Sequence, residues 1–259
     1  MVSHKASLVL KHMNSKFLLI PILFLAPFFT KPITGEDVVK LMYKKYAGKW
    51  ARTLVFDQTT DIYRDTAKTT QIWHESMYFP DKLRIDREPV ANGSSTIFRG
   101  DSTYNIRNGK VTASASGNDL IFLLGGLYFY PLDKTLDKLK SQGYDLSKAT
   151  EDTYNGKAIY IIGAANKDEK ASQLWVNKDD LYLVRMIKYD KNNQGAITKQ
   201  DAIFAGYIKI GGGGAETKVT FYINDKLRQV ESYYNCKQQP DMHQQIFDPQ
   251  HPEKIEYKN

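Results

Sequence analysis

The sequence predicts a mainly β domain (α+β) built on one large antiparallel sheet that curls but does not close. Short segments with alternating apolar and polar residues follow one another at hairpin spacing over most of residues 52–257, and amphipathic helical periodicity is found in two short segments. About ten or eleven strands are expected, and a single sheet of that size is expected to curl. Two helices are too few to cover such a sheet, so its aromatic-rich strands should leave an apolar concavity that holds side chains, a lid or a ligand.

Residues 1–35 have the composition of an export signal peptide. Basic residues, Lys5 among them, precede an apolar core over residues 17–29. Met13 is an alternative start to Met1, because a leader that begins there has a more usual length. The apolar core is shorter than a membrane-spanning helix, and no cysteine follows it for lipid attachment. We therefore expect cleavage and a soluble product, with an uncleaved membrane anchor as the alternative.

The mature domain, residues 36–259, has only a mild net charge. The full chain has a net charge of +7, and lysines within residues 1–35 supply four of these charges. The remainder of about +3 does not favour a nucleic-acid-binding protein. Cys236 is the one cysteine, so no internal disulfide can form and the domain must be stabilised by core burial. No linker or repeat divides this span into two domains.

The first elements of the mature domain are a helix and a series of strands. Apolar residues at helical spacing predict an amphipathic helix over residues 36–47, with Thr34 as its N-cap and Gly48 as its stop. From Trp50 the period changes to two, and Asn108-Gly109 is a two-residue hairpin turn. The strands expected here cover residues 52–63, 70–79, 83–86, 96–99 and 102–107, and a further strand begins at Val111.

The middle of the chain contains a nearly uninterrupted apolar segment, residues 120–131. As a helix it would be roughly 18 Å long, too short to cross a bilayer, and it has no one-sided apolar stripe. Gly125-Gly126 weakens a helix and supplies a bend. Such a segment is either a buried core helix or a lid over an apolar cavity, and composition alone favours the core helix.

The remainder of the chain returns to strands after one more short helix. Leucines at helical spacing predict that helix over residues 133–142, with Gly143 as its stop. Asn155-Gly156 and Asn224-Asp225 are hairpin turns between strands. The strands expected here cover residues 158–163, 173–177, 181–189, 201–210, 218–224, 226–235 and 254–257.

Motifs for catalysis are lacking, and we expect no enzymatic activity, no cofactor and no metal. The mature domain keeps His74, His243 and His251, which have no cysteine or histidine partners at metal-ligand spacing. No Gly-x-Ser-x-Gly sequence is present, so a nucleophile elbow is absent. The glycine run over residues 211–214 precedes a strand and lacks the lysine of a phosphate-binding loop.

The order of these segments resembles the LolA-like superfamily of periplasmic lipoprotein carriers. Residues 79–86, Phe-Pro-Asp-Lys-Leu-Arg-Ile-Asp, are similar to that family's Arg-Pro-Gly-Lys-Phe-Arg-Trp strand, and Phe247-x-Pro249 is similar to its C-terminal Phe-x-Pro element. Phe79 stands where carriers have the arginine that helps to hold the lid shut. Arg84 matches the second arginine of the motif and is the candidate lid latch.

The resemblance implies an open β half-barrel with a helical lid, Leu120–Phe129, that acyl chains displace. The chain is then a soluble periplasmic carrier of acylated lipoproteins or other lipids, with transient contact to membrane surfaces. Partners implied by the resemblance are an inner-membrane ATP-driven release complex and an outer-membrane acceptor. Gly125 and Gly126 are the predicted lid hinge. The predicted lipid-binding residues of the cavity and lid are Leu54, Phe56, Trp73, Met77, Phe79, Leu83, Ile85, Phe98, Leu120, Ile121, Phe122, Leu123, Leu124, Leu127, Tyr128, Phe129 and Trp175.

Two other functions remain open at this point. One is an envelope stress sensor of the same fold, which binds a lipid and a regulatory partner. The other is a scaffold domain in which the apolar segment is simply core.

Overall fold

The computed structural model describes residue 1 and residues 32–191 and 194–250. The chain divides into two units, Met1–Pro32 and Ile33–Asn259, and the fold described below is that of the second. The expected signal peptide, residues 1–35, lies almost wholly outside the described residues, and the expected strand over residues 254–257 lies wholly outside them.

The N-terminal helix of this unit, α1 (Gly35–Tyr46), forms where the sequence predicts it. Thr34 caps it: the Asp37 amide donates to the Thr34 hydroxyl at 3.2 Å, and the Asp37 carboxylate accepts from the Thr34 amide at 3.0 Å. This reciprocal pair satisfies two backbone donors that the first turn cannot satisfy itself. The chain leaves the helix through Gly48, whose φ of +74° suits glycine.

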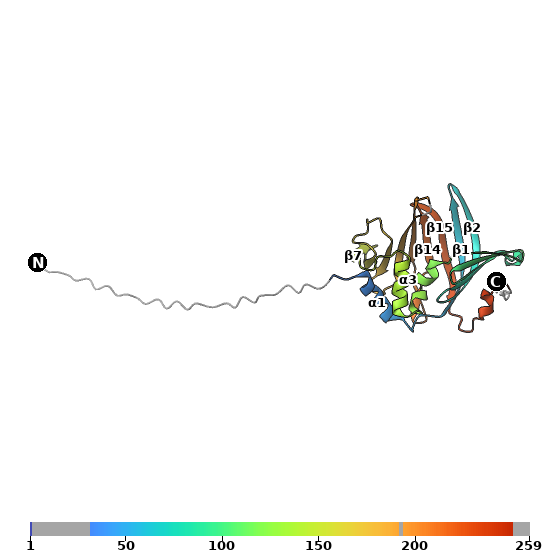
Figure 1. Ribbon diagram of the computed structural model, residues 1–259, viewed down its shortest axis with the longest axis horizontal. Coiled ribbons are helices and arrows are strands. Elements are labelled where there is room, and N and C mark those ends of the chain that lie inside the picture. The colour runs from blue at the N-terminus through green and yellow to red at the C-terminus, as the bar shows by residue number, and fades with distance from the viewer. Residues whose placement is uncertain (2–31, 192–193, 251–259) are drawn as a thin grey trace. The chain divides into compact units, whose positions relative to one another are not determined.

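One antiparallel sheet of 13 strands forms the body of the unit, in the order β6-β5-β4-β3-β2-β1-β15-β14-β11-β10-β9-β8-β7. Its end strands, β6 and β7, are not paired with each other, so the half-barrel is open, as predicted. The long β1 and β2 strands stand side by side near its centre (Figure 1). The first six strands are β1 (Thr53–Arg64), β2 (Ala67–Tyr78), β3 (Lys82–Arg87), β4 (Ser95–Arg99), β5 (Ser102–Arg107) and β6 (Lys110–Ser114).

The second part of the chain supplies more strands than the alternation pattern indicates. β7 was not expected, because its sequence, Ala-Thr-Glu-Asp-Thr-Tyr, is mostly polar; it is an edge strand. The strand expected over residues 201–210 is two strands, and the second pairs with β13 outside the main sheet. These strands are β7 (Ala149–Tyr154), β8 (Lys157–Ile162), β9 (Gln173–Asn177), β10 (Leu183–Lys191), β11 (Ile197–Ala205), β12 (Ile208–Ile210), β13 (Gly213–Ala215), β14 (Lys218–Ile223) and β15 (Lys226–Lys237).

The three predicted hairpin turns are confirmed. Asn108-Gly109, Asn155-Gly156 and Asn224-Asp225 each join two strands whose flanking residues pair directly, and all six turn residues have φ between +49° and +76°. Positive φ at both central positions matches the twist of the flanking strands, which is why Asn-Gly sequences fix the register there.

The three α-helices lie on one face of the sheet, which we call the inner face. α1 and α3 (Leu132–Ser141) lie close together over the β7 end of the sheet, and α2 (Asp119–Leu123) and the short 3-10 helix η2 (Gly126–Tyr128) join them there (Figure 1). Two further 3-10 turns, η1 (Val90–Asn92) and η3 (Gln244–Phe247), complete the elements. η3 packs against β3 and β4 on the opposite, outer face.

Candidate functional site

The lid, residues 120–129, is two short helical turns, not one continuous helix. Asn118 caps α2 by accepting a hydrogen bond from the Leu120 amide at 3.0 Å, and the chain then breaks at Gly125 before η2. Ile121, Phe122 and Leu123 are each 3% exposed, so the apolar segment is buried against the inner face. Burial of this extent removes most of the segment's apolar area from water and stabilises its packing on the inner face; that the segment opens as a lid stays a prediction.

The glycine pair lets the lid approach the sheet closely. A Cβ at Gly125 would lie 2.5 Å from Trp50 Nε1 and 2.9 Å from the Phe79 ring, and a Cβ at Gly126 would lie 2.4 Å from the Pro80 carbonyl oxygen. Neither residue has a φ in the left-handed region. The structure therefore shows why both positions need glycine, namely close packing; the hinge role predicted for them stays a prediction.

Polar contacts fasten both ends of the lid. Before it, Lys188 Nζ on β10 lies 2.6 Å from the Asp119 carboxylate, which also accepts a hydrogen bond from Gln142 Nε2 at 2.9 Å. After it, the Tyr43 hydroxyl on α1 donates to the Tyr130 carbonyl at 2.9 Å. The sequence analysis identified none of these contacts, because they join residues that are far apart in the chain.

An open groove of about 700 Å³ lies beside the start of the lid. Phe98 and residues 116–120 form one wall. The other wall comes from β10, β11, β14 and β15, where Met186, Ala202 and Phe221 supply apolar surface. The Asp119–Lys188 ion pair lies at this groove, since both residues line it. A cavity of this size on the inner face can take an extended apolar chain.

Most of the predicted lipid-binding residues are on the inner face, in two apolar clusters. One cluster, under α1 and α3, includes Phe122, Leu123, Leu127 and Tyr128, with Leu120 and Leu124 packed against it. The other, mainly on β1 to β3, includes Leu54, Phe56, Trp73, Met77, Phe79, Leu83 and Ile85, together with Ile121 of α2, and Phe98 and Phe129 are packed against it. Of this set, Phe98 and Leu120 also line the open groove.

Trp175 is not part of this cavity, and its inclusion was wrong. Its neighbours on β9, Leu174 and Val176, point to the inner face, so the alternation of the strand turns Trp175 to the outer face. There its indole donates to Gln173 at 2.8 Å and stacks under the Arg185 guanidinium, 4.5 Å away. Strand periodicity places a residue on one of two faces, and it does not say which face is inner.

The role of Arg84 as a lid latch is also corrected. Arg84 lies on the outer face of β3, where its Nε donates to the Asp86 carboxylate at 2.8 Å and its Nη1 donates to the Ile246 carbonyl at 3.0 Å. The guanidinium thus ties η3 to the sheet, on the face opposite the lid. Phe247 is 1% exposed in the same outer-face cluster, so the predicted Phe-x-Pro element is a packing element there.

Three buried carboxyl groups on the inner face were missed. Glu75, Glu216 and Glu231 are 6%, 6% and 7% exposed, respectively. Burial raises the pKa of Glu216 to about 8, and burial together with the nearby Glu231 raises the pKa of Glu75 well above its usual value. In Glu231, burial raises the pKa against hydrogen bonds that favour the ionised form, from Tyr233 first. All three therefore hold protons more tightly than ordinary carboxyls.

A sequence signal for these groups exists. The period-two pattern of β2 and β15 predicts that Glu75 and Glu231 point inward. The same pattern on β1 predicts that Gln58 points inward. A polar residue at a predicted core position deserves a functional explanation. Among the described residues, no group of three or more His, Cys, Asp or Glu side chains is placed to hold a metal ion.

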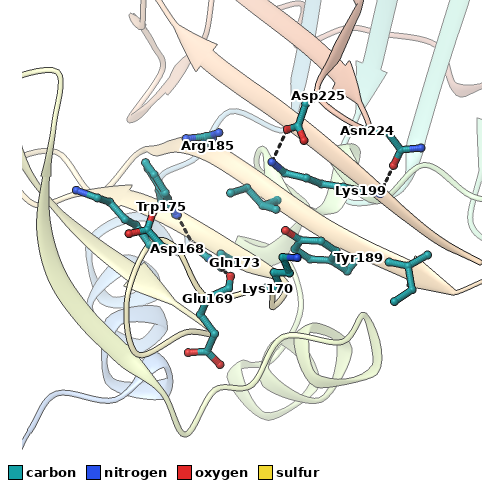
Figure 2. Close-up of a pocket in the computed structure, with 13 residues that line it drawn as sticks. Asp168, Glu169, Lys170, Gln173, Trp175, Arg185, Tyr189, Lys199, Asn224 and Asp225 are labelled. Atoms are coloured by element: carbon teal, nitrogen blue, oxygen red, sulfur yellow. Dashed lines mark hydrogen bonds and ion pairs between the residues drawn. The ribbon is translucent and has the colours of Figure 1, made fainter.

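A second cavity, of about 740 Å³, lies on the outer face (Figure 2). Its polar lining is largely engaged in pairs: Lys199 with Asp225 at 2.6 Å, and Arg185 with Asp201 at 2.6 Å. Trp175 and Tyr189 supply apolar surface there. None of the described residues that line this cavity belongs to the lid or to the inner-face clusters, so we regard the groove on the inner face as the candidate site.

Comparisons with known proteins show the fold. A Desulfovibrio piger protein of the DUF1329 family is 16% identical, with a TM-score of 0.59 and 83% of this chain and 95% of that chain covered. A Vibrio parahaemolyticus structure described as an outer membrane lipoprotein-sorting protein domain is 11% identical, with a TM-score of 0.59 and coverage of 83% and 97%. A LolA superfamily protein from Nitrosomonas europaea is 10% identical, with a TM-score of 0.54 and coverage of 84% and 98%.

No family model and no curated protein matches the sequence. The three structures agree with the predicted architecture, and the fold is LolA-like. In the described residues, no helix has the length and apolarity to cross a bilayer.

Proposed function

Because the chain has a LolA-like fold, we propose that it is a carrier that binds acyl chains of lipoproteins or other lipids on the inner face of the half-barrel. The observation that supports this most directly is the groove of about 700 Å³ at the start of a lid made almost wholly of apolar residues. In this proposal the chain acts by binding, without bond-making. An acyl chain enters at Phe98 and Leu120 and displaces lid side chains from the two inner-face clusters.

The burial of the lid determines how long an acyl chain must be to displace it. Full burial of one Leu, Ile or Phe side chain stabilises by about 1.5–3 kcal/mol, and burial of each acyl methylene contributes about 0.8 kcal/mol. Displacing Ile121, Phe122 and Leu123 is therefore offset by roughly six to eleven methylenes. A long chain binds with net gain and a short one does not. Competition between lid and cargo also lowers the net affinity, which lets a carrier release what it holds.

The same proposal covers location and partners. The signal peptide expected over residues 1–35 would export the chain to the periplasm, where it is cleaved and the domain is soluble. An inner-membrane ATP-driven complex would load it, and an outer-membrane acceptor would receive the cargo. The proteins from Vibrio parahaemolyticus and Nitrosomonas europaea, described as lipoprotein-sorting and LolA superfamily proteins, support this assignment by fold alone.

Titration with an environment-sensitive fatty-acid probe tests the proposal. Phe98 is a partly exposed wall of the groove, so Phe98→Glu should weaken probe binding about tenfold or more by placing a charge beside the chain. The control is Ile197→Glu, which places the same charge at a residue 64% exposed and lining the outer cavity. Equal binding by both variants and the unaltered protein would contradict the proposal. Mass spectrometry of organic extracts of natively purified protein is a separate measurement that would identify the cargo.

A further inference from the structure

The buried carboxyl groups of the inner face form one cluster with a buried amide. The Gln229 amide on β15 donates to one oxygen of Glu231 at 2.5 Å, and the Tyr233 hydroxyl donates to the other. Gln58, on the neighbouring strand, is 0% exposed; its Nε2 donates to the Thr60 hydroxyl at 2.7 Å, and its side chain also lowers the pKa of Glu231. The charge of Glu231 acts on both Glu75 and Glu216, so the three carboxyls and Gln58 share one region of the inner face.

This cluster has more hydrogen-bond acceptors than donors. Gln58 Oε1 is fully buried and accepts no hydrogen bond within the described part of the chain. The Glu75 side chain is only 6% exposed, and it forms no hydrogen bond or ion pair with another of the described residues. Buried polar atoms are normally satisfied, and an unsatisfied one costs about 1–3 kcal/mol. The arrangement is therefore incomplete as it stands.

The cluster also lies where a ligand in the groove would reach it. Gln229 lines the open groove, and it is the residue that hydrogen bonds Glu231. Glu216 lines a small closed space between Leu54, Met77 and Leu124 of the lid. The acceptors thus extend from the inner end of the groove to the underside of the lid, and apolar side chains surround them, such as Phe56, whose ring stacks on Tyr233 at 4.4 Å.

We propose that Glu75, Glu216 and Glu231, with Gln58, bind the ammonium end of an amine-bearing amphiphile whose apolar chain lies in the groove. The inference rests on the proposed carrier function and names the chemistry of the cargo. A primary ammonium has three N–H donors and a positive charge, so it satisfies Gln58 Oε1 and the Glu75 carboxyl together. In the empty protein, burial makes these carboxyls hold their protons more tightly than ordinary carboxyls do; binding of the cation favours the ionised form of one of them, which releases a proton to solvent.

Other titratable groups face this region as well. Arg87 on β3 lowers the pKa of Glu75, while Tyr233 and Cys236 on β15 have raised pKa values because they are buried. Arg87 lies over the Trp73 ring, 4.7 Å from its centroid, and its Nη1 donates to Thr96. Arg87 therefore acts on Glu75 through its charge, but among the described residues it forms no ion pair with any of the three carboxyls.

Four ligands with the same twelve-carbon chain test the proposal by calorimetric titration of the full-length protein: dodecylamine, dodecanol, dodecanoate and dodecyltrimethylammonium. We expect dodecylamine to bind at least tenfold more tightly than dodecanol and dodecanoate, with proton release that is visible as buffer-dependent heat. The trimethylammonium ligand has the charge without N–H donors, so it should bind less tightly than the primary amine. Ethanolamine and choline phospholipids with short chains repeat this contrast for a lipid headgroup source.

Glu231→Gln and Glu75→Gln supply the residue-level test. Both replace a carboxyl with a neutral side chain of the same size, so melting should show them folded. Each should lower the amine preference about tenfold and leave dodecanol binding unchanged, whereas Glu151→Gln on the edge strand β7 should change neither. Equal binding of amine and alcohol would overturn this inference but leave the carrier proposal intact. Failure of all four ligands to bind would overturn both.

Discussion

The two halves of the inner face are built on different principles. Under α1 and α3 the interior is mainly apolar: Ile162 and Val176 are 0% exposed, and the lid packs directly on this cluster. On β1, β2 and β15, by contrast, Glu75 and Glu231 share the surface with Phe56 and Met77. The first half serves stability, since it can be closed by packing alone. The second half retains polar groups that burial penalises, which is typical of a surface kept for a ligand.

The largest expected effect is the loss of packing in the apolar half. Ile162→Ala should lower the free energy of unfolding by about 2–4 kcal/mol, because the residue is fully buried beneath α1 and leaves a cavity. Chemical denaturation measures this loss. In the other half, Glu231→Gln should lower the free energy of unfolding by only about 1 kcal/mol, because the side chain keeps its size and loses one of the two hydrogen bonds that the carboxyl accepts from Gln229 and Tyr233. Similar losses of stability in both variants would contradict the difference between the two halves.

A pH effect of similar size should come mainly from the carboxyl half. The pKa of Glu216 is about 8 in the folded protein and 4.5 in the unfolded chain, so the folded state holds the proton more tightly. Its favourable contribution is present below pH 4.5 and is lost as pH rises toward 8, by about 1.4 kcal/mol per pH unit between the two pKa values. Urea unfolding at pH 5, 6.5 and 8 should show stability falling with pH, and Glu216→Gln should show a smaller fall.

His74, on the outer face, also contributes to the pH dependence, so the unaltered protein must be compared with Glu216→Gln. Burial lowers the pKa of His74, but its hydrogen bonds to Glu88 and Asp57 outweigh burial and raise it overall. Its contribution is present below the unfolded pKa and is also lost as pH rises, so the slope of a single protein mixes the two groups. The difference between the unaltered protein and Glu216→Gln isolates the inner-face carboxyl. An identical pH slope in both would contradict the assignment.

The lid fastening should affect exchange more than stability. Lys188→Met removes the ion pair with Asp119; the lysine side chain is 19% exposed and the aspartate 43%. Pairs of this kind contribute about 0.2–1 kcal/mol, so the melting temperature should hardly change. The fatty-acid probe should nevertheless dissociate several times faster, because opening the lid no longer separates two charges.

Lys199→Met is the matched control for that variant. Lys199 forms an ion pair of the same length with Asp225, and its side chain is 23% exposed, but the pair lines the outer cavity (Figure 2). We expect the control to lose similar stability and to leave probe dissociation unchanged. Equal acceleration in both variants would show that the Asp119–Lys188 pair does not fasten the lid.

Cys236 should give the smallest effect. The thiol is half-buried and packs against the apolar cluster that includes Phe56 and Met77, and burial raises its pKa to about 11. It is therefore protonated at neutral pH and should react slowly with thiol reagents. Cys236→Ser should change stability by less than about 1 kcal/mol and leave ligand binding unchanged. Fast labelling at pH 7 would show that this part of the sheet opens readily.

The sequence by itself determined what depends on local rules. Thr34 with Asp37 makes the cap of α1, Asn108-Gly109 makes a tight hairpin turn, and alternation in β1 places Leu54 and Phe56 on one face. These outcomes follow from backbone geometry within a few residues, so neighbouring residues suffice to predict them.

Only the tertiary structure decided which face of each strand is inner and what lies opposite it. Trp175 and Arg84 follow the strand period yet point outward, and the Asp119–Lys188 contact joins residues 69 positions apart. The role of Gly126 as a close contact of Pro80 likewise depends on where the lid rests. Each of these depends on the curl of the whole sheet, which sums small twists over 13 strands and is recorded at no single position of the chain.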